Sequence, residues 1–503
     1  MDESTRTKES NLAATGVAGL DDILCGGLTP HRVYLVEGDP GAGKTTLGLQ
    51  FLLEGRDRGE RGVYVALSET RDELLAVAGS HGWSLDGIEI CELGPTEESL
   101  SSEEENTMFY PSELELAETI KAVLKRIDDI RPSRVVFDSL SEIRLLAQSS
   151  LRYRRQILAL KIFFIGKQCT VMLLDDRTAE INDLQLQSIA HGVLALERKS
   201  PEFGVMQRRL QIFKMRGRAY RAGFHDYVIE PGGLKVFPRL LATDHAGGTG
   251  IGQIKSEIPE LDALMCGGLD EGTSTLLMGP AGAGKSTIST QYAMAAAKRG
   301  DRVAFFLFDE SEKTLLKRSR GVGLDIEAQI KAGRIAIRQV DPGQMSAGEF
   351  VHYVRTEVES QNAKMVVIDS LNGYLNAMPE ARFLTLALHE LLSYLGRRGV
   401  NTLLIVAQQG LIGAMTTPVD ASYLADTVVL LRYFEAAGQV RQAISVLKRR
   451  SGDHERSIRE LTISHQGIAI GPPLEQFQGV LTGVPQFVGQ HAHYSTPASS
   501  ATR

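Results

Sequence analysis

Two glycine-rich segments of this chain have the residue spacing of a phosphate-binding loop. Each places a lysine and then a hydroxyl residue directly after its last glycine, between a strand-like and a helix-like stretch. The backbone N–H groups of such a loop bind phosphate oxygens, and the dipole of the following helix favours the same anion. The residues expected to bind nucleotide are Gly38, Asp39, Pro40, Gly41, Ala42, Gly43, Lys44, Thr45 and Thr46, and again Gly279, Pro280, Ala281, Gly282, Ala283, Gly284, Lys285, Ser286 and Thr287.

The residue types in these loops are those that bind ATP together with Mg²⁺. Lys44 and Lys285 are expected to reach the β- and γ-phosphates, since a lysine at this place follows the phosphate chain. Thr45 and Ser286 are expected to supply hydroxyl oxygens to Mg²⁺. Because the pattern occurs twice in the same local context, the sequence predicts two ATP sites.

Two aspartates are candidates for holding the metal ion. Asp138 and Asp369 each end an apolar, strand-like run. A carboxylate at that place lies close to a phosphate-binding loop and can hold Mg²⁺ through water. The alternative is that each aspartate only caps the helix that follows its strand.

Further acids are candidates for activating the attacking group. Glu69 and Glu310 end the strand that follows each loop's helix, and a carboxylate there can orient or deprotonate a water or hydroxyl. The alternative is an acid favoured in the first turn of the next helix. Asp309 precedes Glu310 whereas Ser68 precedes Glu69, so the second site has two adjacent carboxylates and the first site has one.

Two basic clusters lie far along the sequence from these loops. The first contains Lys214 and Arg216, and the second contains Lys448 and Arg450. Such side chains can complete the site of a neighbouring subunit, as arginine fingers do. They can equally be ordinary charged residues at exposed strand ends.

Internal repetition determines how the chain is divided. Residues 15–46 and 256–287 agree at 13 of 32 positions when they are aligned without a gap. This period is far too long for a solenoid and predicts a tandem duplication of one globular domain. A Gly-rich stretch marks the join, so we expect a first domain at 1–245 and a second at 246–489.

Two segments stand outside this pattern. Residues 490–503 are Ser, Thr, Ala and His without periodicity, which predicts a disordered tail. Residues 94–112 are strongly acidic and have no equally acidic counterpart in the second half. We interpret them as a solvated surface insertion.

Short apolar runs alternate with amphipathic stretches within each half. In the first half the helices are predicted at 45–59 and at 112–132, the latter capped by Ser112 and ended by Pro132. Strands are predicted at 33–38, 61–69, 134–139 and 169–176. Alternating strands and helices predict an α/β domain with a mostly parallel sheet.

Composition excludes several classes of protein. The 503 residues carry a formal charge of −7 and only 6% aromatic residues, which disfavours a dedicated nucleic-acid-binding protein. No apolar run is long enough to span a membrane, and the N-terminus shows no secretory signal, so we expect a cytoplasmic protein. Four cysteines do not make a disulfide framework. Cys25 and Cys266, at equivalent positions of the repeat, are expected to be small buried residues.

The doubled loop, the CGGL segment before each loop, the strand-end acids and the basic clusters together resemble the KaiC family of circadian clock ATPases and autokinases. The resemblance extends from about Thr15 to Pro485, and segments 420–435 and 456–470 are similar to the C-terminal domain of that family. It implies two RecA-like domains in a double-ring homohexamer, with ATP between subunits. It also implies slow ATP hydrolysis in the first ring and phosphate transfer to serine or threonine of the same chain in the second.

The chain departs from the family pattern at several places. The first-ring pair of glutamates corresponds to Ser68-Glu69, and the second-ring pair to Asp309-Glu310. The family's adjacent phosphoacceptors align with Ser422-Tyr423, which makes Ser422 the expected acceptor. Thr417, which aligns with a nearby family threonine, is the reserve. Without the resemblance, Ser422 can equally be a residue that starts a helix after Asp420.

The resemblance also bears on the partners of the chain. The charged C-terminal segment that binds KaiA in cyanobacterial members is not recognisable after Pro485, so a KaiA-type partner is not expected. KaiB-like or other signalling proteins remain candidates. Two other functions fit RecA-like domains: a DNA-binding motor, and a scaffold that binds nucleotide without transferring phosphate. The acidic total weakens the first, and the complete sets of carboxylates weaken the second.

Overall fold

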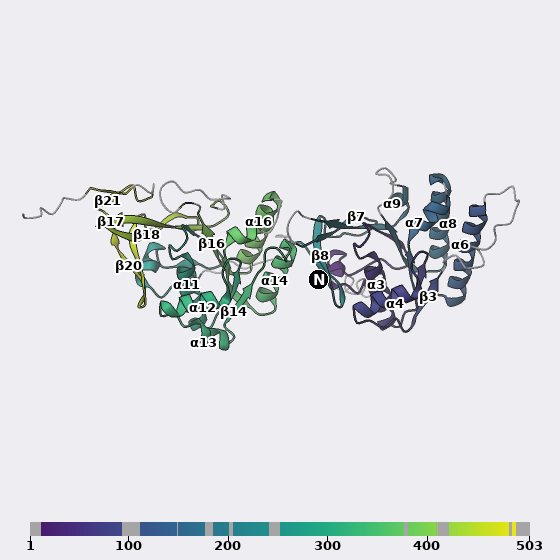
Figure 1. Ribbon diagram of the computed structural model, residues 1–503, viewed down its shortest axis with the longest axis horizontal. Helices are drawn as coiled ribbons and strands as arrows, with labels where there is room; N and C mark the ends of the chain where they lie inside the picture. The colour runs from purple at the N-terminus through teal and green to yellow at the C-terminus, as the bar shows by residue number, and fades with distance from the viewer. Residues whose placement is uncertain are drawn as a thin grey trace, which may run out of the picture. The chain divides into compact units, whose positions relative to one another are not determined.

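The chain folds into two compact units, divided between Arg239 and Leu240. The computed structural model describes residues 12–92, 111–147, 149–176, 185–200, 205–240, 252–376, 381–408, 410, 422–481 and 485–488. Most of the acidic segment 94–112, nearly all of the predicted join and the predicted tail lie outside these residues. Figure 1 shows the helices and strands of each unit.

The first unit is built on a nine-stranded sheet with the order β3-β2-β4-β5-β1-β6-β7-β8-β9. Its first six strands pair in parallel, and β7, β8 and β9 extend the sheet in antiparallel fashion. The strands are β1 Val33–Gly38, β2 Gly62–Ala66, β3 Ile88–Glu92, β4 Arg134–Asp138, β5 Thr170–Asp176, β6 Gly192–Lys199, β7 Gln207–Met215, β8 Phe224–Glu230 and β9 Gly233–Phe237.

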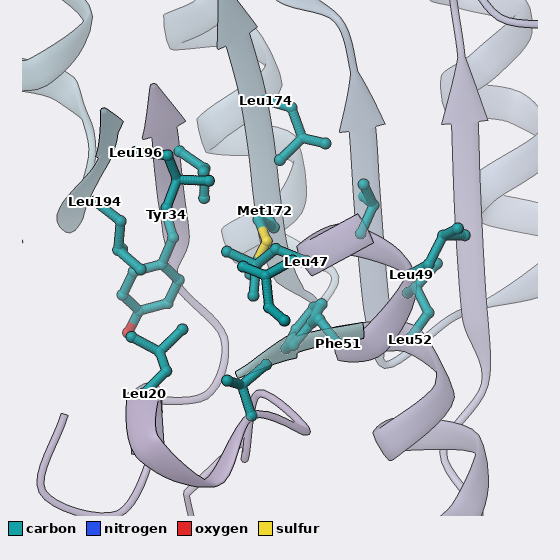
Figure 2. Packing of buried hydrophobic residues seen from close by; sticks show 14 of the residues in the cluster. Leu20, Tyr34, Leu47, Leu49, Phe51, Leu52, Met172, Leu174, Leu194 and Leu196 are labelled. Carbon is teal, nitrogen blue, oxygen red and sulfur yellow. The ribbon is translucent and has the colours of Figure 1, made fainter. Parts of the chain in front are cut away.

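Helices cover both faces of this sheet. The helices are α2 Ala18–Ile23, α3 Lys44–Asp57, α4 Arg71–Ser80, α6 Pro111–Ile130, α7 Leu140–Ala147, α8 Ser150–Gly166 and α9 Gln185–Ile189. One core forms between the sheet and α2, α3 and α4, and Figure 2 shows Leu47 and Phe51 of α3 packing there on Met172. A second core forms on the opposite face beneath α6, α7 and α8.

The second unit repeats this architecture. Its sheet has the order β14-β13-β15-β16-β12-β17-β18-β19-β20, again with parallel strands first and an antiparallel extension. The strands are β12 Ser274–Gly279, β13 Arg302–Leu307, β14 Ile335–Gln339, β15 Ala363–Asp369, β16 Asn401–Ala407, β17 Thr427–Ala436, β18 Gln439–Arg449, β19 Arg459–Ser464 and β20 Gly467–Pro473. The predicted fold, two RecA-like α/β domains with mostly parallel sheets, is confirmed.

The helices of the second unit also lie on both faces of its sheet. They are α10 Pro259–Leu264, α11 Lys285–Arg299, α12 Glu312–Gly321, α13 Ile326–Lys331, α14 Ala347–Glu359, α15 Leu371–Asn376 and α16 Ala381–Arg397. Two short pairs of strands complete the unit, β10 Gln253–Ile254 with β11 Leu269–Asp270 and β21 Phe477–Gln478 with β22 Gln486–Phe487. No described helix of either unit is both long and apolar enough to cross a membrane.

Three local predictions were wrong. Helix α6 begins at Pro111, one residue earlier than predicted, so Ser112 lies inside the helix instead of capping it; proline suits a first helical position because its missing N–H is not needed there. Strand β2 ends at Ala66 and β13 ends at Leu307, so Glu69 and Glu310 lie beyond their strands and not at their ends. Cys25 and Cys266 are exposed, not buried; each follows a short helix and has a left-handed conformation, with φ of 54° and 49°.

A buried arginine joins helix α3, which follows the phosphate-binding loop (P-loop) of the first unit, to the sheet. The side chain of Arg134 is fully buried and donates to the carbonyls of Ala14 (2.7 Å) and Phe51 (2.8 Å) and to Glu60 (2.5 Å). A Cβ on Gly55 would lie 2.5 Å from Arg134 Cδ, so only glycine fits there. In the second unit the equivalent positions hold Ala296 and Met365, both buried.

Candidate functional site

Each phosphate-binding loop runs from the carboxyl end of a central strand to the first residue of a helix. Gly41 and Gly43 have φ of 75° and 94°, and Gly282 and Gly284 have φ of 76° and 98°, which L-residues with a Cβ rarely adopt. The glycines of the motif are therefore required by the backbone of the loop. The loop places the amino end of α3 or α11 next to the carboxyl ends of the strands, where phosphate is bound in such motifs.

Both loop lysines fold back over their own loop. Lys44 Nζ donates to the carbonyls of Gly38 (2.9 Å) and Asp39 (3.1 Å). Lys285 Nζ donates likewise to Gly279 (2.9 Å) and Pro280 (2.7 Å). Burial lowers the pKa of Lys285 to about 8, with the nearby Asp369 carboxylate opposing this effect.

Four residues from different parts of the chain converge beside the first loop. The Thr45 hydroxyl at the start of α3 donates to Asp138 at the end of β4 over 2.9 Å and contacts Glu69 over 3.4 Å. The Tyr64 hydroxyl on β2 donates to the same Asp138 oxygen over 2.5 Å. Asp138 therefore faces the loop hydroxyl. Glu69 lies before the Thr70 N-cap of α4, outside the first turn of that helix.

The acids of the first site are less acidic than in water. Partial burial raises the pKa of Glu69 to about 7, and the neighbouring Asp138 carboxylate adds to this effect. Burial also raises the pKa of Asp138, although the hydrogen bonds from Tyr64 and Thr45 oppose the shift. A carboxylate whose pKa is near 7 is suited to accept a proton at neutral pH.

The second site repeats this arrangement with different supports. The Ser286 hydroxyl lies close enough to Asp369 to lower the pKa of this acid, although burial, the larger effect, raises it. Glu310 forms an ion pair with Arg318 of α12 (2.8 Å). Asp309 accepts a hydrogen bond from the Ser370 hydroxyl. Burial raises the pKa of Glu310, while Arg318 lowers it, so the arginine keeps this acid closer to its ionised form.

The donor set of each site fits a hydrated magnesium ion that also binds phosphate. Among the described residues, no group of three or more His, Cys, Asp and Glu side chains can hold a metal by itself. Mg²⁺ characteristically takes one or two protein oxygens and completes its shell with water and phosphate. One carboxylate oxygen of Glu69 and one of Glu310 are buried and have no hydrogen-bond partner within the described chain. A bound water or substrate hydroxyl would satisfy both.

The basic clusters lie at the other end of each sheet. Lys214 pairs in register with Val193, near the beginning of β6, and Lys448 pairs with Val428, near the beginning of β17. The loops leave the opposite, carboxyl ends of the parallel strands. Lys214 and Arg216 both donate to the carbonyl of Ser188. The structure therefore does not bring these clusters to the P-loop of their own domain.

The second cluster contacts the segment that contains the expected phosphoacceptor. Lys448 Nζ donates to the carbonyl of Ser422 over 2.8 Å, and Arg450 donates to the carbonyl of Tyr423. Ser422 lies in a turn before β17, and no helix begins there, so the helix-starting alternative is wrong. Thr417 lies outside the described residues.

Sequence reasoning missed four side chains that contact the candidate residues. Tyr64, Arg318 and Ser370 hold Asp138, Glu310 and Asp309, as described above. The fourth is Asp176, the last residue of β5, whose carboxylate lies 2.6 Å from Lys44 Nζ. The only signal in the sequence was the pair of aspartates that ends the apolar run 169–176.

The comparisons with known proteins agree with this geometry. A family model for the KaiC ATPase matches residues 13–240 and again residues 254–475. The chain is 27% identical over 488 residues to the circadian clock protein KaiC3 of Synechocystis sp. PCC 6803, a match that covers 95% of both chains.

A second relative is the circadian clock oscillator protein KaiC of Synechococcus elongatus. It is 25% identical over 478 residues, which cover 94% of this chain and 91% of the relative. The oscillator protein KaiC of Acaryochloris marina is also 25% identical, over 476 residues. Since both halves match the family model and the relatives align along nearly the whole chain, this protein belongs to the KaiC family of ATPases.

Proposed function

We propose that this KaiC-family ATPase is also a serine/threonine autokinase that uses Mg²⁺-ATP and works as a homohexamer. In this proposal the first domain hydrolyses ATP and the second transfers phosphate to its own chain. The observation that carries it is the duplicated site. In each domain a loop hydroxyl lies beside a strand-end aspartate, to which Thr45 is hydrogen-bonded in the first domain, and next to a glutamate with one buried oxygen that has no partner among the described residues.

Hydrolysis in the first domain needs a base, and Glu69 has the required position and pKa. Water attacks the γ-phosphorus, the bond between the γ-phosphorus and the bridging oxygen breaks, and ADP leaves. The proton of the attacking water passes to Glu69, whose pKa is raised to about 7. Mg²⁺, held by Thr45 and through water by Asp138, would neutralise charge on the phosphates.

Phosphate transfer in the second domain uses a hydroxyl in place of water. The serine oxygen forms the new bond to phosphorus, and its proton passes to Asp309 or Glu310. Arg318 and the Ser370 hydroxyl hold these two acids in separate orientations. The second site therefore has two oriented carboxylates that can accept the proton of the serine hydroxyl. The first site has only Glu69, because Ser68 stands where the second site has Asp309.

The position of the second basic cluster supports catalysis between subunits. Lys448 and Arg450 lie at the far end of the sheet from their own loop and bind the carbonyls of Ser422 and Tyr423. A ring in which this end of one domain meets the P-loop of the next would bring Ser422 toward a neighbour's ATP. We propose that the resulting phosphorylated state is read by KaiB-like or other signalling partners, in circadian or related signalling.

Incubation of the purified protein with γ-labelled Mg²⁺-ATP tests this function. Phosphate release measures hydrolysis, and intact mass with phosphopeptide mapping measures autophosphorylation. Lys44→Ala should chiefly reduce phosphate release, and Lys285→Ala should chiefly abolish self-labelling. If either substitution removed both activities equally in intact hexamers, the proposed division between the two domains would be wrong.

The acceptor is tested by the same mapping. Phosphate is expected on Ser422, with Thr417 as the reserve, and Ser422→Ala should lose most of the label. A serine oxygen lies close to the backbone, so the main chain can position it for in-line attack, whereas the Tyr423 oxygen lies several Å further out. Label found mainly on Tyr423, or undiminished in Ser422→Ala, would contradict the assignment.

A further inference from the structure

The lysine of the first loop is paired with a carboxylate from the neighbouring strand. Lys44 Nζ lies 2.6 Å from Asp176 Oδ1, and the two side chains are 8% and 29% exposed. The ammonium group has three protons. Gly38, Asp39 and Asp176 each accept one, so all three donors are in use.

The second domain has a different residue at this place. Asp176 stands beside Gly38 in the register of β5 with β1, and Ala407 stands beside Gly279 in the equivalent register of β16 with β12. Lys285 therefore has two carbonyl acceptors and, within the described chain, no ion-pair partner. Its third donor is available for a phosphate oxygen, whereas the third donor of Lys44 is occupied.

The fold directs Asp176 toward the loop and its neighbour away from it. Successive residues of a strand point to opposite faces of the sheet. Asp175 is buried on the other face, where it forms an ion pair with Arg144 over 2.5 Å. Besides Lys44, Asp176 contacts the Ser141 hydroxyl at 3.4 Å. The charge of Asp176 is thus compensated by the lysine that binds phosphate in this motif.

We propose that Asp176 is a positioning residue that competes with the phosphates of ATP for Lys44 and lowers the nucleotide affinity of the first site. A triphosphate must displace the carboxylate to reach the lysine, and the displaced carboxylate then lies close to phosphate oxygens of the same sign. After hydrolysis, the ion pair between Asp176 and Lys44 forms again, which favours release of ADP and phosphate. This inference rests on the proposed binding of ATP at the first loop.

The affinity of each site can be measured separately with a fluorescent ATP analogue and Mg²⁺. In Lys285→Ala protein the analogue reports the first site. There Asp176→Asn should tighten binding at least about fivefold. Fully exposed ion pairs contribute up to about a fivefold change in an equilibrium constant, and a pair with one buried member should contribute more. Asp176→Glu, which keeps the charge, should bind nearly as the parent does. In Lys44→Ala protein, Ala407→Asp should weaken the second site by a similar factor.

The sign of the change separates competition from a structural role. If the ion pair only held the loop in shape, Asp176→Asn would bind the analogue equally or more weakly, and this result would overturn the inference while ATP binding by the parent stood. Tighter binding by Asp176→Asn together with weaker binding by Ala407→Asp would support it. If Lys285→Ala protein bound no analogue with or without Asp176→Asn, the proposed function of the first site would be wrong, and the inference with it.

Discussion

Replacing Glu69 by glutamine should stabilise the first domain at alkaline pH, although it removes a proposed base. In the folded domain the pKa of Glu69 is raised from 4.5 to about 7, first by burial and then by the Asp138 carboxylate. The folded protein thus holds this proton more tightly than the unfolded chain does. The stability that the protonated group contributes is complete below the unfolded pKa of 4.5 and is lost as pH rises through about 7.

The magnitude follows from the size of the shift. At about 1.4 kcal/mol for each pH unit, a rise from 4.5 to about 7 corresponds to about 3.5 kcal/mol of lost stability above neutral pH. Glu69 is only half-buried, and solvent screens its charge, so we expect about 1–2 kcal/mol. Glutamine keeps the shape without the charge. The free energy of unfolding of Glu69→Gln should exceed that of the wild type by this amount at about pH 8, and the difference should nearly vanish at about pH 3.5, below the unfolded pKa.

Trp83 gives a probe of the first domain alone. It is the only tryptophan in the chain, and its ring lies 4.7 Å from that of His81, against the core beneath α3. Urea denaturation followed by its fluorescence, without Mg²⁺ or nucleotide, measures the unfolding of this domain. As a control, Glu310→Gln in the second domain should leave the transition unchanged. The reasoning is refuted if Glu69→Gln is no more stable than the wild type at pH 8, or if it gains equally at both pH values.

Three further predictions concern other parts of the molecule. Gly55→Ala should destabilise the first domain by about 1–2 kcal/mol in the same assay, because its Cβ would lie 2.5 Å from Arg134, whereas Gly79→Ala in α4, whose Cβ meets nothing within 4 Å, should stabilise it. Arg318→Ala should move the pH–rate profile of self-labelling to higher pH, since Glu310 loses the charge that lowers its pKa; Arg320→Ala, which removes only an exposed pair with Glu327, should not. Lys285→Ala protein mixed with Arg450→Ala protein should regain self-labelling after subunit exchange, and failure to do so would contradict catalysis between subunits.

The features that the sequence predicted well are those encoded locally. The glycine spacing of each loop requires a particular backbone, and the apolar runs around it identify strands and helices without knowledge of distant residues. The duplication then places the second domain by comparison with the first. For this reason the fold class and the convergence of Thr45 with Asp138 could be anticipated from a single chain.

The contacts that the sequence did not predict depend on the register between strands. Asp176 and Lys44 are 132 positions apart, and only the pairing of β5 with β1 places them together. The same pairing decides which of two adjacent aspartates faces the loop. Likewise, the sequence order of Lys448 and Arg450 does not reveal that they lie at the opposite end of the sheet from the loop.

The contact between Gly55 and Arg134 restricts how the two halves of the gene can exchange sequence. The first half pairs a glycine with a buried arginine, and the second half pairs Ala296 with Met365 at the same places. A recombination event that transferred only one position would set an arginine against an alanine methyl group, or leave a methionine beside a glycine with too little volume to fill the gap. Transfer of a single one of these codons between the repeats is therefore expected to cost stability, whereas transfer of both would keep the packing intact.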